Sequence, residues 1–149
     1  MFRGPTIVAL LLLVVAAIAV LTGCPQAGAD KEYRYEVEIS VTGGWGDNMD
    51  VEVADEASGQ TIAEELGVET PVELKFGGLI DYSAPVGLSV AATAENLAAG
   101  EEFAVRIRYT EKAYNDPVTY TVEEGTGRNS SGAAEDTTYA TTFVVPYQP

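Results

Sequence analysis

The chain has 149 residues, of which 23 are acidic, 8 are basic and none is histidine, and its net charge is −15. A charge this negative disfavours binding to nucleic acid and to anionic lipid headgroups. The lack of histidine removes the commonest general base and metal ligand, and with it any Ser–His–Asp or Cys–His catalytic arrangement.

An unbroken apolar run occupies residues 7–21, with Arg3 as the single positive charge before it and small residues after it. Fifteen residues are fewer than the roughly 20 that a membrane-spanning helix needs. A basic start, an apolar middle and a small-residue end are typical of a secretory signal peptide. The run therefore predicts an N-terminal signal helix rather than a transmembrane anchor.

Cys24 is the only cysteine and closes the sequence Leu21-Thr22-Gly23-Cys24, which resembles the lipobox of prokaryotic lipoproteins. The resemblance implies cleavage before Cys24, lipidation of that residue with acyl chains such as palmitate, and a mature domain outside the cytoplasm. We therefore expect a signal peptide over residues 1–23, a lipidated N-terminus and tether over 24–32, and a folded domain over 33–149. The expected location is the extracytoplasmic side of the cell membrane, held by the acyl chains alone because no polybasic segment follows.

The folded domain opens with the clearest strand pattern in the chain. Residues 33–42 alternate strictly between apolar and polar side chains, which indicates a strand with one buried face. A glycine-rich turn follows, and residues 49–54 alternate again, which predicts the hairpin partner of the first strand. Residues 60–63 predict a short edge strand, although Ile62 and Leu66 at i, i+4 spacing would also suit a helical turn.

Pro71 opens a further strand over residues 72–76, and the loop after it carries apolar groups that look exposed. Residues 86–93 are weakly polar on both faces, so they predict a central strand covered on both sides. Alternation also predicts strands at 103–109, 118–122 and 139–145, whereas the polar, glycine-rich segment 123–138 predicts a flexible loop. Seven or eight short strands without crossover helices indicate an all-β fold, an antiparallel β-sandwich.

The turn after the first strand holds the main candidate binding residues. Asp47, Asn48 and Asp50 bring oxygen-bearing side chains together, which is the chemistry that calcium prefers, although an ordinary Asx turn is the simpler explanation. No cofactor is expected otherwise. Trp45 in the same turn either covers the end of the sandwich as an apolar plug or contacts a ligand or partner, since tryptophan is enriched at binding hot spots.

The 123–138 segment contains Asn129-Ser130-Ser131, which fits the acceptor pattern for N-glycosylation. Such triplets occur often by chance in Ser/Gly-rich loops. If the host glycosylates exported proteins, Asn129 would be the modified residue, because the loop is expected to be exposed.

The layout of a short membrane segment followed by a Tyr35-Glu36-Val37 strand opening a small sandwich is similar to the mycobacterial MmpS-type accessory proteins of lipid transporters. The lipobox departs from the retained transmembrane anchor of that family. These observations together favour a non-enzymatic binding or transport-accessory lipoprotein that contacts an envelope protein. The alternatives are an envelope hydrolase that uses carboxylates or calcium, and a structural component of the cell surface.

Overall fold

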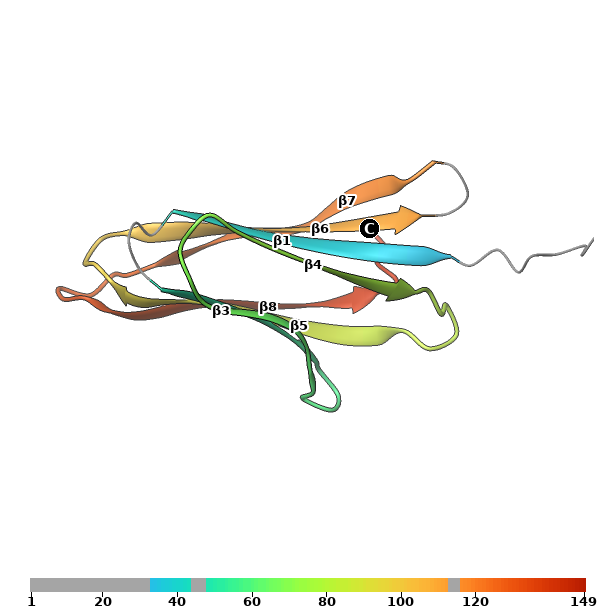
Figure 1. Ribbon diagram of the computed structural model, residues 1–149, viewed down its shortest axis with the longest axis horizontal. Coiled ribbons are helices and arrows are strands. Elements are labelled where there is room, and N and C mark those ends of the chain that lie inside the picture. The colour runs from blue at the N-terminus through green and yellow to red at the C-terminus, as the bar shows by residue number, and fades with distance from the viewer. Residues whose placement is uncertain (1–32, 44–47, 113–115) are drawn as a thin grey trace, which may run out of the picture. The chain divides into compact units, whose positions relative to one another are not determined.

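The computed structural model describes residues 33–43, 48–112 and 116–149. In this part of the chain, eight strands form two four-stranded antiparallel sheets that face each other in two layers (Figure 1). The all-β antiparallel sandwich predicted from the alternation of side chains is therefore confirmed. The signal helix expected within residues 1–23 lies outside the described residues.

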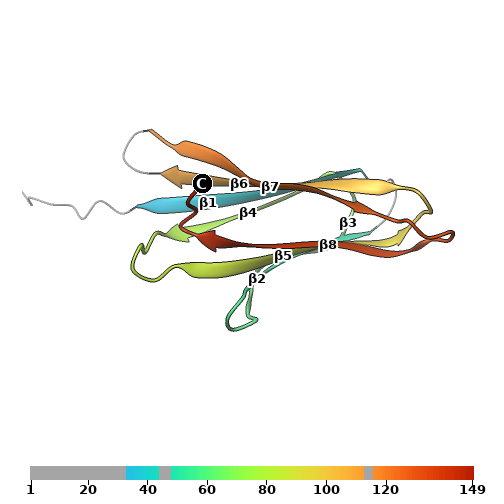
Figure 2. The same cartoon turned by 180° about the vertical axis from the view of Figure 1, so that it is seen from behind.

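The first layer, sheet A, has the strand order β4-β1-β6-β7. Its strands are β1 (Arg34–Gly43), β4 (Val72–Leu79), β6 (Glu102–Lys112) and β7 (Val118–Arg128). The second layer, sheet B, has the order β3-β2-β5-β8. Its strands are β2 (Met49–Asp55), β3 (Thr61–Val68), β5 (Val86–Leu97) and β8 (Glu135–Val145). Figure 2 shows the same two layers from behind.

The core fills the space between the sheets and comes from alternate residues of the strands. On β1, Val37, Ile39 and Val41 are fully buried, as their alternation predicts. Burying an aliphatic side chain of this size contributes about 1.5–3 kcal/mol, so the inner faces supply most of the driving force for folding. The buried hydrophobic residues are Val37, Ile39, Val41, Met49, Val51, Val53, Val72, Leu74, Leu88, Val90, Ala92, Ala94, Leu97, Phe103, Val105, Ile107, Tyr109, Phe143 and Val145.

Two strands of sheet B differ from their predictions in detail. β3 is an edge strand of eight residues, and both Ile62 and Leu66 lie exposed on it, so the helical alternative does not occur. β5 is central in its sheet, but its second face is only half-buried at Ser89, Ala91 and Thr93. The expectation that β5 is covered on both sides is wrong, because a two-layer sandwich has no third layer to cover the outer face.

The predicted flexible loop at 123–138 is also wrong, because most of that segment is strand. β7 continues to Arg128 and β8 begins at Glu135, so that only residues 129–134 connect them. Gly127 is buried opposite Phe103, and a Cβ atom on Gly127 would collide with the Phe103 ring. Gly125 has the same relation to the ring of Tyr139 on β8. The glycines therefore make room for aromatic rings within a strand.

Six of the eight strands begin or end at the side of the sandwich where β1 begins; the strands of the shorter β2–β3 hairpin do not. We call this side the β1 end and define it by Tyr33, residues 79–86, Lys112, Val118 and residues 144–149. The register places Arg34 beside both Leu79 and Lys112, and Val86 beside Val145. The C-terminus lies at this end too (Figure 1). In the described part of the chain, no helix is long and apolar enough to cross a membrane.

Candidate functional site

The predicted calcium loop is only partly within the described residues. Trp45 and Asp47 lie outside them, so neither the plug nor the contact role of Trp45 is addressed. The Asn48 side-chain amide donates a 3.4 Å hydrogen bond to Glu95 at the end of β5, whereas Oδ1 of Asp50 accepts a 2.7 Å bond from the backbone of Gly67 on β3. The two oxygen-bearing side chains thus engage strands on opposite sides of β2. Where the structure describes side chains, no three His, Cys, Asp or Glu residues group together as metal ligands.

Asn129 is buried rather than exposed, so the structure contradicts the site predicted for glycosylation. Its Nδ2 atom, which a glycan would modify, donates hydrogen bonds of 2.6 Å to the backbone oxygen of Leu97 and 2.8 Å to that of Ala133. Its Oδ1 atom accepts bonds from the backbone and hydroxyl of Ser131. The residue is 0% exposed, and it fixes the β7–β8 connection against the end of β5. Its role is structural.

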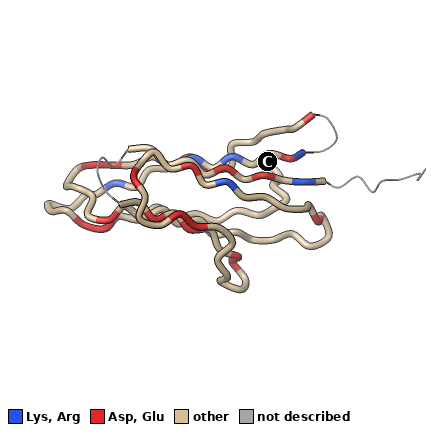
Figure 3. The backbone as a smooth tube through the Cα atoms, viewed as in Figure 1, with Lys and Arg blue, Asp and Glu red and all other residues tan. Residues whose placement is uncertain are grey.

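The charged side chains divide unevenly between the layers. Every Lys or Arg within the eight strands belongs to sheet A, and the strands of sheet B contain eight acidic residues and no basic one. Figure 3 shows the basic residues confined to the strands of sheet A. The outer face of sheet B is therefore acidic, and it repels anions and anionic surfaces.

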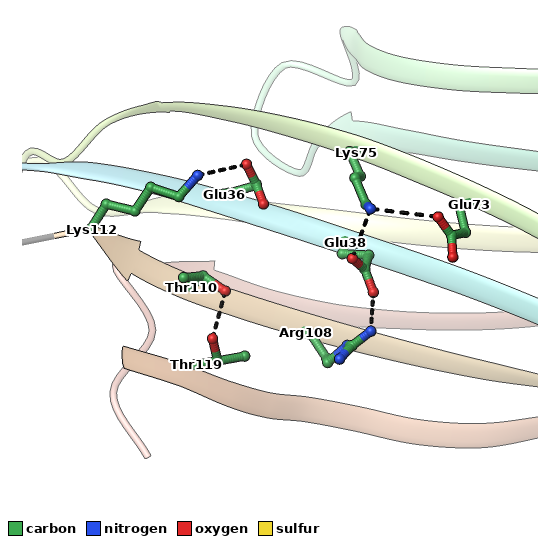
Figure 4. Close-up of polar contacts among 8 residues, drawn as sticks. All are labelled: Glu36, Glu38, Glu73, Lys75, Arg108, Thr110, Lys112 and Thr119. Atoms are coloured by element: carbon green, nitrogen blue, oxygen red, sulfur yellow. Dashed lines mark hydrogen bonds and ion pairs between the residues drawn. The ribbon is translucent and has the colours of Figure 1, made fainter. Parts of the chain in front are cut away.

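Sheet A balances its charges through ion pairs that cross from strand to strand (Figure 4). Glu38 on β1 lies between Lys75 on β4, at 3.1 Å, and Arg108 on β6. Hydrogen bonding from Lys75 is the main cause that lowers the pKa of Glu38 below its ordinary value; burial opposes it, and hydrogen bonding and charge from Arg108 add to the lowering. Lys112 pairs with Glu36 at 2.8 Å, further along the same face. These pairs link β4, β1 and β6 on the outer face of sheet A, and each of the three basic residues lies beside a carboxylate.

Tyrosines gather at the β1 end, partly in the core and partly at the surface. Tyr109 is fully buried and stacks between Tyr35 and Tyr120, with ring centroids 6.0 and 6.4 Å away, and Tyr147 packs on the same group. Burial raises the pKa of Tyr109 to about 12, with the charge of Glu111 adding to the effect. Tyr139 on β8 also packs against the core, at a distance from this group along the chain.

Tyr33 and Tyr82 form the exposed part of this group. Their rings meet edge to face with centroids 6.1 Å apart. The hydroxyl of Tyr82 donates a 2.5 Å hydrogen bond to Glu111 at the end of β6, and this bond raises the pKa of Tyr82 to about 12. The contact holds the loop between β4 and β5 against sheet A.

An open cleft of about 470 Å³ lies beside this loop, between the unpaired edges of β7 and β8. Its lining mixes rings and alkyl groups with one carboxylate and one amide, which suits binding by apolar contact with a few polar anchors. The lining residues are Tyr82, Pro85, Val122, Glu123, Thr142, Phe143, Val144, Pro146, Tyr147 and Gln148.

Only part of this cleft can be predicted from the sequence. The apolar groups in the loop before Pro85 are visible in the sequence, and Tyr82 is indeed exposed. That this loop lies beside β7, β8 and the C-terminal residues depends on the pairing of strands far apart in the chain. No local pattern reports such pairing.

No protein-family model matches the chain, and no curated protein matches its sequence. The chain is similar in structure to the crystal structure of a domain of unknown function, DUF4425, from Bacteroides vulgatus. The two share 12% sequence identity with a TM-score of 0.40, over 76% of this chain and 96% of that domain.

Proposed function

We propose that this protein is an envelope lipoprotein, anchored through Cys24 to the extracytoplasmic side of the cell membrane, whose sandwich is a non-enzymatic binding or transport-accessory module. The observation that carries the proposal is the sequence of residues 7–24, in which a signal-like apolar run ends in Leu21-Thr22-Gly23-Cys24. The order of a basic residue, an apolar run and small residues before the cysteine is the order expected of an exported, cleaved precursor.

The layout of the folded part supports a binding role. The cleft between β7 and β8 offers aromatic, aliphatic and amide groups, which come from these two strands, from the β4–β5 loop and from the residues after β8. The cleft lies at the β1 end, where the tether joins the sandwich, so a ligand or partner held there would be kept close to the membrane surface. An envelope protein in the same membrane is the partner that this arrangement suits.

The test compares wild-type protein with Cys24→Ser in cells of a lipoprotein-producing prokaryote that are supplied with labelled palmitate. We expect the wild-type protein to carry the label and to sediment with membranes. The variant should lose the label and leave the membrane fraction, with its sandwich still folded, because the described strands begin at Arg34, ten residues after Cys24. Ala27→Ser, a similar small change in the tether, should behave as wild type.

Firm retention of the unlabelled variant in the membrane would contradict the proposal. The apolar run of residues 7–21 would then be an uncleaved anchor.

A further inference from the structure

The exposed apolar side chains of the sandwich are concentrated at the β1 end. In the described residues, eight large hydrophobic side chains are exposed, and two of them, Ile62 and Leu66, lie on β3. The other six all belong to the β1 end: Tyr33, Leu79, Tyr82, Val86, Val118 and Val144. Scattered exposed apolar residues need no explanation, but a group gathered at one end of a domain is typical of an interaction surface.

The most exposed members of this group stand on firmly held backbone. Leu79, 60% exposed, is the last residue of β4 and pairs with Arg34, and the next residue donates a 2.8 Å backbone bond to Tyr33. Tyr82, 54% exposed, is fixed by its bond to Glu111 and by its ring contact with Tyr33. Tyrosines that present an apolar ring and a polar hydroxyl are enriched at the interface between lipid and water.

The charges decide which side of the sandwich can approach a bilayer. The charged residues in the strands of sheet B are all acidic, so anionic headgroups repel the outer face of this sheet. At the β1 end, Arg34 and Lys112 lie side by side where β1 and β6 meet, and the acidic Asp81 and Glu111 accept hydrogen bonds from Ser83 and Tyr82. Lys112 also pairs with Glu36, so the β1 end carries both basic and acidic side chains, whereas the charged residues in the strands of sheet B are all acidic.

The tether limits how far this end can move from its anchor. Nine Cα–Cα steps separate Cys24 from Tyr33, and a fully extended chain of that length reaches at most about 30 Å. A strand of 11 residues, such as β6, is about 36 Å long, so the opposite end of the sandwich can stand well away from the lipid. The tether joins the sandwich at the apolar end.

We propose that the β1 end rests on the interfacial layer of the bilayer that holds the acyl chains of Cys24, with Leu79, Tyr82 and Val86 inserted among the headgroups. This proposal rests on the proposed lipid anchor. It adds a second, non-covalent membrane contact that fixes the orientation of the sandwich, with the turns of the opposite end directed away from the membrane.

The test uses the full lipidated protein, reconstituted in vesicles of phosphatidylcholine and phosphatidylglycerol that include brominated phosphatidylcholine. Ala84→Cys and Ala99→Cys place an environment-sensitive fluorophore in exposed loops at opposite ends of the sandwich. Acylated Cys24 does not react with the fluorophore, so each variant carries one label. We expect a blue shift and quenching by brominated lipid at position 84 and neither change at position 99.

A pair of matched double variants then tests the apolar group itself. Leu79→Ser with Val86→Ser should abolish the shift and the quenching at position 84. Ile62→Ser with Leu66→Ser, which removes equally exposed apolar side chains from β3, should preserve both. All four residues are exposed, so we expect the fold to survive.

Three outcomes would overturn the proposal, and they are distinguishable. If the label at 84 is as accessible to water as the label at 99, in protein whose mass includes the acyl chains, the membrane contact is refuted and the lipid anchor is not. If the protein carries no acyl chains, both the proposed anchor and the proposed contact are refuted. A label at 84 that is protected in native membranes but not in lipid vesicles shows that another protein, rather than lipid, covers the β1 end.

Discussion

The side-chain amide of Asn129 donates a 2.6 Å hydrogen bond to the backbone oxygen of Leu97, which lies 32 positions earlier in the chain. Leu97 ends β5 in sheet B and Asn129 follows β7 of sheet A, so this bond ties the two layers together at the end opposite the β1 end. Two backbone hydrogen bonds hold Asn129 in the same place: its N–H donates to the oxygen of Glu101, and its oxygen accepts from the N–H of Gly100.

Replacing Asn129 by alanine should destabilise the protein. The change leaves the buried oxygen of Leu97 without its donor and frees Ser131, and we expect a loss of roughly 2–3 kcal/mol in the free energy of unfolding. Urea unfolding of the purified chain measures this loss. Asn48→Ala is the matched control, because Asn48 is exposed and makes one long side-chain bond, and its effect should be within about 0.5 kcal/mol. Equal stability of the two variants, or a glycan found on Asn129 in folded protein, would contradict the buried position.

A second prediction concerns the glycines of β7. Alanine at Gly127 places a methyl group against the ring of Phe103, which is buried and cannot move away. We expect a loss of about 1–3 kcal/mol from overpacking, measured by thermal or urea unfolding. Gly132→Ala provides the control in the neighbouring connection, where no atom lies within 4 Å of the added group, so stability should hardly change. If both variants unfold alike, Gly127 does not lie under that ring.

These two positions show where the sequence was informative and where it was not. The alternation of Tyr35, Val37, Ile39 and Val41 predicted the inner face of β1 correctly, because the pleat of a strand and the burial of one face act residue by residue. Glycine and asparagine are typical of loops, so the sequence around Gly127 and Asn129 predicts a flexible loop where the structure has a strand and a buried side chain. Their actual positions depend on Phe103 and Leu97, which pairing brings near from earlier strands, and no local pattern contains that information.

The same limit applies to the candidate site. The apolar loop after β4 was visible in the sequence, but the gathering of Val86, Val118 and Val144 around it follows only from the strand registers. The calcium loop was predicted from side-chain chemistry. In the structure, Asn48 bonds to Glu95 on β5 and Asp50 bonds to Gly67 on β3, because β2 lies between these two strands and each side chain bonds to a different one.

A third prediction concerns the pH dependence of the ion pairs on sheet A. The pKa of Glu38 is lowered by Lys75 and Arg108, so its charged form stabilises the folded state above the ordinary carboxyl value, and this contribution is lost as the pH falls through the lowered pKa. Glu38→Gln should therefore reduce stability near neutral pH and have little effect in strong acid. Urea unfolding across this pH range measures the difference, and added salt should diminish it.

Glu36→Gln is the control for this prediction, because Glu36 has one basic partner within ion-pair distance where Glu38 has two. Its effect at neutral pH should be smaller. A loss for Glu38→Gln that persists unchanged in acid would show that packing, rather than charge, is responsible.

A fourth prediction addresses the envelope partner. If Trp45 is a contact residue, a pull-down from membranes in mild detergent should recover a partner with the wild-type protein and lose it with Trp45→Ala. Ile62→Ala, which truncates an exposed apolar side chain on β3, outside both the turn that holds Trp45 and the cleft, should retain the partner. Recovery of the same partner with Trp45→Ala would assign Trp45 to the apolar plug and place the docking surface elsewhere, with the cleft between β7 and β8 as the next surface to vary.

The central claim, an anchor at Cys24, is tested most directly by the intact mass of the mature protein extracted from membranes. We predict a mature chain whose first residue is Cys24, with added mass equal to whole acyl chains and with those chains located on Cys24 by fragmentation. A membrane-bound protein that still begins at Met1, or a chain that begins at Cys24 without acyl chains, would contradict the account.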